Sequence, residues 1–180
     1  GTPVLTAARN ATKAIPIVFV GIADPVGQGF VASLARPGGN ITGATDQYRD
    51  VAGKQLSLLK EIVPSAKRIA ILSNPTNPSL PLVIQDMQVA AKTLRLETMI
   101  VNAAASAEFE KAFAEIARDR PAALVVLSDS LFGSEAVRLM TLAAKHRLPT
   151  IGRNVIPEGG GLMSYGPNPL DLVRRAAILA

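Results

Sequence analysis

The stretch Lys67–Pro78, KRIAILSNPTNP, decides the fold that the sequence predicts. Its apolar run Ile69–Leu72 has the length and composition of a strand that is buried on both faces. The run stops at polar residues that carry hydroxyl and amide groups, and a helix-like segment follows from Ser79. A strand, a polar loop and a helix make half of a βαβ unit. Ligands of open α/β sheets bind at the loops that follow the carboxyl ends of such strands.

The same pattern occurs twice more in the chain. Two other apolar runs end in small polar residues: Ile17–Val20 before Asp24 and Pro25, and Leu124–Leu127 before Ser128 and Asp129. The three sets of loop residues contain no obvious catalytic group apart from the two aspartates. The pattern therefore favours a binding cleft over a catalytic centre.

Strands and helices alternate regularly between residues 67 and 151, which predicts a doubly wound parallel sheet with right-handed crossovers. We also expect a short helix over Gln28–Leu34, where Phe30 and Val31 are spaced for one helical face. The run Leu162–Tyr165 breaks the alternation, so we expect the chain to leave the sheet there.

The composition predicts a folded chain of one sizeable domain or two small lobes. Of its 180 residues 48% are hydrophobic, and the mean hydropathy is +0.28, which excludes disordered and fibrous classes. Aromatic residues make up only 4%, so the core must be aliphatic. Cysteine is absent and His146 is the only histidine, which argues against disulfides, a metal site and a catalytic triad. The segment Gly27–Gly29 lacks the rest of a dinucleotide fingerprint, and we predict no cofactor.

The charge pattern argues against a nucleic acid partner, and the hydropathy pattern argues against a membrane span. The net charge is +5, yet the basic residues are spread along the chain without interleaved aromatic residues. No apolar run reaches the roughly 18 residues that a membrane span needs. We therefore expect no nucleic acid partner and no direct membrane insertion.

The polar residues after the strands have two interpretations each. Asp24 and Asp129 could hold an ammonium or a hydroxyl group, or they could stabilise a turn or cap a helix. Ser73, Asn74 and Asn77 could recognise a carboxylate or an amide, or they could stabilise the turns before the prolines that follow them. Their position at the carboxyl ends of strands favours the functional interpretation.

Four long blocks of the chain resemble a known family. They are DPVGQGFVASLARPGGNITG (24–43), AGKQLSLLKEIVPSAKRIAILSNPTNP (52–78), LAAKHRLPTI (142–151) and GGLMSYGPN (160–168). Together they resemble the tryptophan/tyrosine-type substrate-binding proteins of ABC transporters, a branch of the type I periplasmic binding protein fold. The resemblance spans nearly the whole chain.

The resemblance implies an α/β architecture of two lobes, each with a doubly wound parallel sheet, joined by a hinge. It implies that residues 1–44 are part of lobe one, that residues 45–162 form lobe two, and that residues 163–180 return to lobe one. Lobe one would then be incomplete in this chain.

The resemblance also implies a ligand site between the lobes. The residues that it places there are Thr2, Asp24 and Pro25 from lobe one, Ser73, Asn74, Asn77, Ser128 and Asp129 from lobe two, and Tyr165 near a hinge crossing. Residues 44–50 and 152–158 differ from the family's pattern, and both segments lie near the hinge or the edges of the cleft.

We therefore expect the solute-binding component of an ABC importer, which binds an amino acid or an aromatic or carboxylate compound and has no catalytic residues. Its partners would be the small-molecule ligand and the membrane permease, and its location periplasmic or extracytoplasmic, with the signal segment outside this chain. Two alternatives remain open. One is the ligand-sensing domain of a transcription regulator with the same lobes. The other is a doubly wound enzyme that uses Asp24 or Asp129, against which stands the lack of an activated nucleophile.

Overall fold

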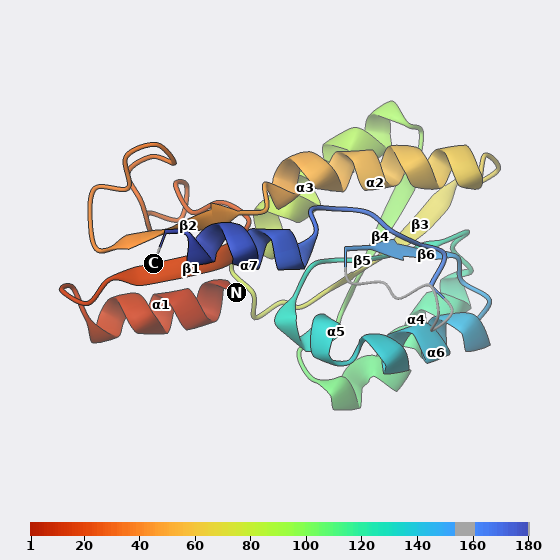
Figure 1. Ribbon diagram of the computed structural model, residues 1–180. Coiled ribbons are helices and arrows are strands. Elements are labelled where there is room, and N and C mark those ends of the chain that lie inside the picture. The colour runs from red at the N-terminus through yellow and green to blue at the C-terminus, as the bar shows by residue number, and fades with distance from the viewer. Residues whose placement is uncertain (154–160, 180) are drawn as a thin grey trace.

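A computed structural model describes residues 1–153 and 161–179 (Figure 1). The elements in these ranges are α1 Thr2–Ala11, β1 Ile17–Ile22, β2 Ile41–Thr45, α2 Tyr48–Ile62, β3 Arg68–Ser73, α3 Leu80–Thr93, β4 Glu97–Asn102, the 3₁₀ turn η1 Ser106–Glu108, α4 Phe109–Asp119, β5 Leu124–Val126, α5 Ser130–Ser134, α6 Ala136–Lys145, β6 Thr150–Gly152, β7 Met163–Ser164 and α7 Pro169–Ala177.

The elements form two groups. In Figure 1, α1, β1, β2 and α7 lie together at one end, and we call them the smaller part; the elements from α2 to β7 form the larger part. Figure 1 marks the N- and C-terminal ends in the smaller part. The C-terminal end lies there because α7 returns to this part after β7. Two connections join the groups. One leads from β2 to α2, and the other leads from β7 to α7.

The larger part is built on a five-stranded parallel sheet with the strand order β4-β3-β5-β6-β7. β3 pairs with β4 on one side and with β5 on the other, with Ile71 opposite both Ile100 and Val125. The sheet confirms the predicted α/β class with parallel strands.

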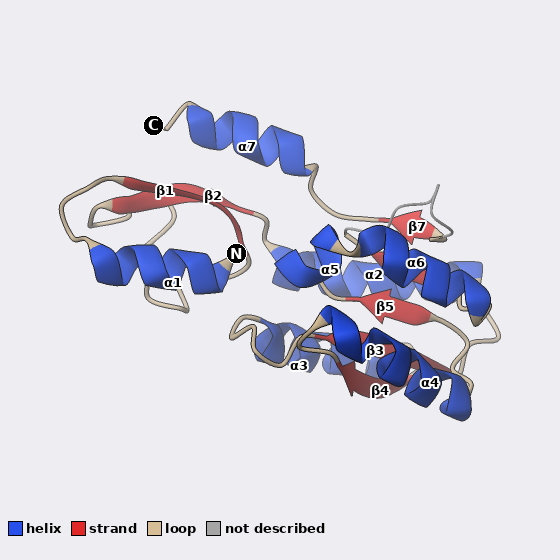
Figure 2. Cartoon of the chain, turned by 90° about the horizontal axis from the view of Figure 1, so that it is seen from below, coloured by secondary structure: helices blue, strands red, loops and turns tan. Residues whose placement is uncertain are grey.

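Both faces of β3 are buried, which explains its uninterrupted apolar run. Ile69 and Ile71 face a core that includes residues of α2 and α3, whereas Ala70 and Leu72 face a second core with residues of α4 and α6. Figure 2 shows these helix pairs on opposite sides of the sheet. Alternate residues of a strand point to opposite faces, so a strand that is covered on both sides must be apolar at every position.

The smaller part has a parallel pair of strands, β1 and β2, between two helices. α1 and α7 lie on opposite faces of this pair (Figure 2), and α7 contacts both strands. A small apolar cluster fills it, formed by Leu5, Phe19, Ile22, Phe30, Val31 and Ile41.

The predicted helix over Gln28–Leu34 is wrong, because turns and bends occupy this segment. Phe30 and Val31 are nevertheless buried, and the backbone N–H groups of both donate to the carbonyl of Pro25. Gly29 has a φ of +68°, a left-handed conformation that interrupts a right-handed helix. The apolar residues of this segment are therefore buried, as their spacing indicates, but they do not form a helix.

The run Leu162–Tyr165 does not leave the sheet at once, which corrects the second expectation. Met163 pairs with Ile151 and Ser164 with Gly152, so that β7 adds a short parallel edge strand. The chain departs for α7 only after this pairing.

The substitution Ile71→Ala should destabilise the larger part strongly. Ile71 is fully buried in the central strand, and truncating such a side chain leaves a cavity that costs about 2–5 kcal/mol of unfolding free energy. The measurement is urea denaturation followed by circular dichroism. Val89→Ala on α3 is the matched control, because Val89 is 62% exposed. Equal losses in both variants would contradict the buried position of β3.

Candidate functional site

A cavity of about 220 Å³ lies between the smaller and the larger part. Its walls come from the start of α1, the end of β1, the connection from β2 to α2, the start of α3, and the loop and short helix after β5. The residues that line it are Gly1, Thr2, Pro3, Gly21, Ala23, Asp46, Tyr48, Asn77, Ser79, Leu80, Ser128, Asp129, Ser130, Gly133 and Ser134. Most of these side chains are small and polar, so the cavity offers hydrogen-bonding groups rather than a broad apolar surface.

Four of the residues that the sequence analysis placed at a ligand site line this cavity. They are Thr2, Asn77, Ser128 and Asp129. Thr2 comes from the smaller part and the other three come from the larger part. The structure thus brings together residues that lie up to 127 positions apart in the chain.

Asp129 is the centre of a hydrogen-bond network on one wall. Its Oδ1 accepts bonds from Asn74 Nδ2 at 3.1 Å and from the backbone N–H of Leu131 at 2.9 Å. Its Oδ2 accepts a bond from Asn77 Nδ2 at 2.7 Å. Asp129 therefore caps α5 and at the same time ties the loop after β5 to the loop after β3.

The two asparagines have local roles as well. Asn74 Oδ1 accepts from the backbone N–H of Thr76 at 3.0 Å, and Asn77 Oδ1 accepts from that of Ser79 at 3.1 Å. Both are Asx-type bonds two residues along the chain, which fix the turns after β3. The turn-stabilising interpretation of these residues is therefore correct, and it leaves their amide nitrogens free to hold Asp129.

Hydroxyl and amide groups join the two parts across the cavity. Thr2 Oγ1 and Ser79 Oγ lie 2.6 Å apart, and Gln28 Nε2 donates to the same Ser79 Oγ at 3.1 Å. Thr2 and Gln28 belong to the smaller part, whereas Ser79 precedes α3. The two parts are thus in direct contact at the wall of the cavity.

Asp24 and Pro25 lie outside the lining of this cavity and line a neighbouring, more open one together with Arg49 and Asp86. Asp24 Oδ1 accepts from the backbone N–H of Gly27 at 2.8 Å, which stabilises a turn. Its Oδ2 lies 3.4 Å from Arg49 Nη1. Arg49 also binds Asp86 at 2.6 Å, and that carboxylate raises the pKa of Arg49. The charged group of Asp24 is therefore engaged in a second contact between the two parts.

Ser73 and Tyr165 are not among the lining residues either. Ser73 is buried at the end of β3, and its carbonyl accepts from the backbone N–H of Ala103 at 2.9 Å. Tyr165 is 37% exposed, and its carbonyl accepts from Gln55 Nε2 at 2.8 Å. Both residues therefore support the loops and connections around the cavity.

The sequence analysis did not identify Asp46, Tyr48 and Arg153. Arg153 Nη1 donates to Asp46 Oδ2 in an ion pair whose side chains are only 9% and 3% exposed. Burial raises the pKa of Asp46, and the positive charge of Arg153 opposes that rise. Tyr48 Oη accepts from the backbone N–H of Ser128 at 3.1 Å, and burial raises the pKa of Tyr48. The sequence feature that could have drawn attention to these residues is the expected difference of segments 44–50 and 152–158 from the family's pattern. Of the second segment, only residues 152 and 153 lie within the described ranges.

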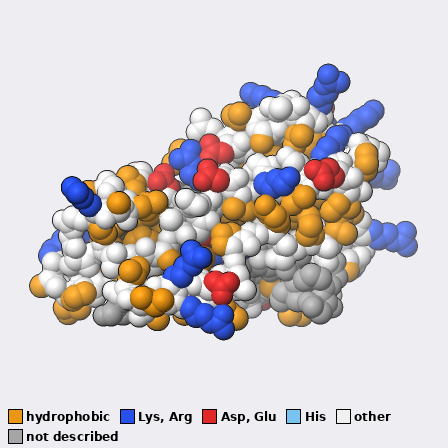
Figure 3. All heavy atoms as spheres, turned by 45° about the horizontal axis from the view of Figure 1, so that its top comes forward, with side chains coloured by type: hydrophobic (Ala, Val, Ile, Leu, Met, Phe, Trp, Pro, Cys, Tyr) orange, Lys and Arg blue, Asp and Glu red, His pale blue; other side chains and the backbone are white. Residues whose placement is uncertain are grey.

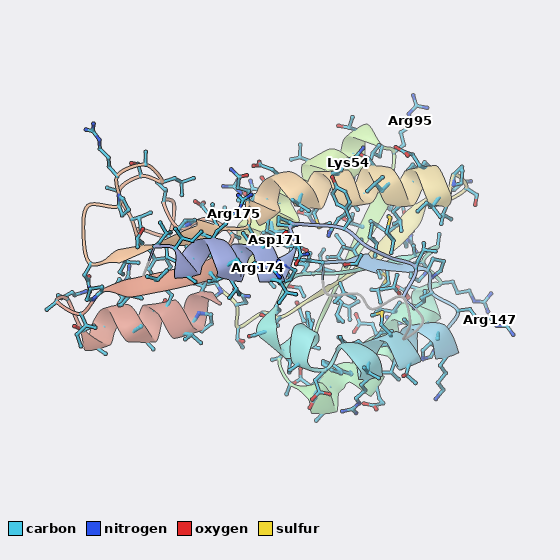
Figure 4. The ribbon with its side chains drawn as sticks, in the orientation of Figure 1. Lys54, Arg95, Arg147, Asp171, Arg174 and Arg175 are labelled. Carbon is cyan, nitrogen blue, oxygen red and sulfur yellow. The ribbon has the colours of Figure 1, made fainter. Side chains whose placement is uncertain are left out.

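Other charged groups are distributed over the molecule. Figure 3 shows Lys and Arg side chains over both parts with acidic side chains among them. In Figure 4, Arg95 and Arg147 lie on the larger part, whereas Arg174 and Arg175 lie on α7. Within residues 1–153 and 161–179, no three His, Cys, Asp or Glu side chains are grouped to hold a metal ion. No helix of these ranges is long and apolar enough to cross a bilayer.

Comparison with known proteins gives consistent matches. The family model described as ABC transporter substrate binding protein matches residues 1–180. The tyrosine-binding protein of Clostridioides difficile (strain R20291) is 32% identical over 150 residues, which are 83% of this chain and 43% of that protein.

Two solved structures match almost the whole chain. The ABC domain in complex with L-Trp from Streptococcus pneumoniae superposes with a TM-score of 0.86 at 23% identity, over 99% of this chain and 61% of that one. A conserved domain protein from Vibrio cholerae O1 biovar El Tor superposes with a TM-score of 0.83 at 26% identity, with the same coverage. The chain thus spans less than two thirds of the length of these relatives.

The substitution Asp129→Ala should lower stability by about 2–4 kcal/mol. It removes the cap of α5 and leaves the amides of Asn74 and Asn77 without their acceptor. The check is the midpoint of thermal unfolding, with Asp171→Ala on the exposed side of α7 as the control. An unchanged midpoint in Asp129→Ala would contradict the network.

Proposed function

The chain belongs to the family of ABC transporter substrate-binding proteins, and from this membership we propose that it is part of the solute-binding component of an ABC importer. The observation that carries this proposal is the polar cavity between two parts that contact each other directly. The proposed partners are a small-molecule ligand and the membrane permease of the transporter. The proposed location is periplasmic or otherwise extracytoplasmic, and the proposed role is binding without catalysis.

We propose that the two parts act as lobes close to the predicted boundaries, with the residues up to Thr45 and those after Ser164 in lobe one and the residues between them in lobe two. The connections from β2 to α2 and from β7 to α7 would be the hinge crossings. A ligand that contacts both lobes binds the closed arrangement better than an open one, and it shifts the population by that difference in affinity. Closure would then present the loaded form to the permease.

The lining supports a ligand that carries a carboxylate. The helices α1 and α3 both begin at the cavity, at Thr2 and Leu80, and the positive end of a helix dipole attracts anions. Thr2 and Ser128 line the same cavity and carry hydroxyl groups. We propose that they bind the carboxylate, and that Asn77 and Asp129 bind other polar groups of the ligand.

We propose an amino acid as the ligand class. The relative from Clostridioides difficile is a tyrosine-binding protein, and the structure from Streptococcus pneumoniae is a complex with L-Trp. The acidic side chains in the lining, those of Asp46 and Asp129, suit the ammonium group that an amino acid carries beside its carboxylate. Aromatic carboxylic acids without an amine are the alternative ligands to be compared with amino acids.

A thermal-shift screen of the full-length protein tests the function. A ligand that binds only the folded state raises the stability of that state by RT ln(1 + [L]/Kd). A ligand concentration of about 100 times the Kd therefore adds roughly 2.7 kcal/mol. We expect L-amino acids to raise the melting temperature and unrelated sugars to leave it unchanged. No shift with any amino or carboxylic acid would contradict the proposal.

Asp24, Pro25, Ser73, Asn74 and Tyr165 remain predicted site residues, and Asp24 offers the sharpest test among them. If Asp24 holds the amine of the ligand, Asp24→Ala should weaken the affinity by about 10-fold or more, since such a hydrogen bond to a charged group contributes about 1.5–3 kcal/mol. Isothermal titration calorimetry with the amino acid from the screen measures the change. An affinity equal to that of the unmodified protein would remove Asp24 from the site.

A further inference from the structure

Asp46 is a buried carboxylate on the cavity wall that the sequence analysis did not assign. It follows β2 directly, in the connection that leads from the smaller to the larger part. The residue is 3% exposed, and it lines the cavity together with Gly21 and Tyr48. The next residue, Gln47, has a left-handed φ of +46°, so the backbone turns sharply at this point. Asp46 thus lies where the cavity meets a connection between the two parts.

Arg153 holds this carboxylate from the other side. Its Nη1 donates to Asp46 Oδ2, and its Nε is buried without a hydrogen-bond partner. Gly21 and Gly166 lie close to the side chain of Arg153. A Cβ atom at Gly166 would lie 3.2 Å from Arg153 Cγ, and a Cβ atom at Gly21 would lie 3.7 Å from Arg153 Nη1. The guanidinium group is therefore fixed between β1, the second connection and Asp46. Such confinement positions the carboxylate of Asp46.

The two acidic side chains of the cavity wall differ in their remaining capacity to accept hydrogen bonds. Asp129 accepts three bonds, from two side-chain amides and one backbone N–H. Asp46 accepts two, one from Arg153 and one from the backbone N–H of Tyr48 at 3.3 Å. An ionised carboxylate has about four acceptor sites. Asp46 therefore has more capacity to accept a donor from a molecule in the cavity.

The balance of charge favours a cationic donor. The described lining includes the carboxylates of Asp46 and Asp129 but no Lys or Arg side chain, and Arg153 behind the wall supplies one positive charge. These formal charges sum to −1, and a protonated amine would place a positive charge against the acidic side chains of the wall. Burial raises the pKa of Asp46, and a cation placed against the carboxylate would offset the cost of that burial.

We propose that Asp46 is a further ligand-binding residue of this cavity, which accepts the protonated amine of the ligand, and that Arg153 is the positioning residue that holds its carboxylate. The inference rests on the proposed function, because it requires a ligand in the cavity.

The experiment compares each amino acid with the same acid without its amine. The full-length protein is titrated calorimetrically with L-tryptophan and indole-3-propionate, with L-tyrosine and 3-(4-hydroxyphenyl)propionate, and with L-leucine and 4-methylpentanoate. We expect the unmodified protein to prefer the amine-bearing member of the pair that it binds. Asp46→Asn should reduce that preference about 10-fold or more and change the affinity for the acid by less than about 3-fold.

Further variants separate recognition from folding. Arg153→Gln should reduce the preference, and Arg153→Lys should restore most of it, because a positive charge then remains beside Asp46. The double variant Asp46→Asn/Arg153→Gln removes both buried charges and is the one to measure if Asp46→Asn does not fold. Asp171→Asn removes a carboxylate of α7 that is not among the lining residues and pairs with Arg174, and it should leave the preference unchanged.

The outcomes separate this inference from the proposed function. Equal losses of affinity for both members of a pair in Asp46→Asn would show a purely structural role and overturn the assignment of Asp46, with the binding function intact. Tighter binding of the acid than of the amino acid by the unmodified protein would overturn it as well. No saturable binding of any of the six probes would overturn the proposed function, and the assignment of Asp46 with it.

Discussion

The structure of the larger part depends on the burial of β3 from Ile69 to Ser73. A strand with apolar cores on both faces and hydrogen-bonded strands on both sides has all its backbone groups satisfied within the sheet. Side chains that need water or a polar partner can therefore occur only where the strand ends. Ser73 and Asn74 come at that point, and the next parallel strand, β5, ends at the same edge with Ser128 and Asp129. The polar wall of the cavity follows from the apolar strands beside it.

Much of the fold and part of the site could be predicted from the sequence, because they depend on local patterns. The run Ile69–Leu72 is apolar at every position, and the polar residues after it are adjacent in the chain, so both the strand and its loop were visible. The pairing of Asp46 with Arg153 was not visible, since the two residues are 107 positions apart and only the folded chain brings them together. β7 has two residues, too few for any periodicity, and the positive φ of Gly29 overrode an apolar spacing of helical type.

The cavity combines hydrogen bonds within the larger part with hydrogen bonds between the two parts. The amides of Asn74 and Asn77 hold Asp129, so this wall keeps its shape whether or not a molecule is present. By contrast, Thr2 and Ser79 bond to each other across the boundary between the two parts, and that contact exists only while the parts are together. A rigid wall on one side and a separable contact on the other are what a binding protein needs, because recognition requires fixed groups and entry requires an opening.

The return of α7 to the smaller part has a mechanical consequence. The larger part is a continuous stretch of chain that is held at both of its ends, and Arg153 contacts both connections, at Asp46 and at Gly166. In the proposed closure, a body attached at two neighbouring points could neither translate freely nor twist about a single tether. Its motion would reduce to rotation about the line through those points. Such a restricted path lowers the entropy that must be lost when the two parts come together, as a short tether does for two linked binding sites.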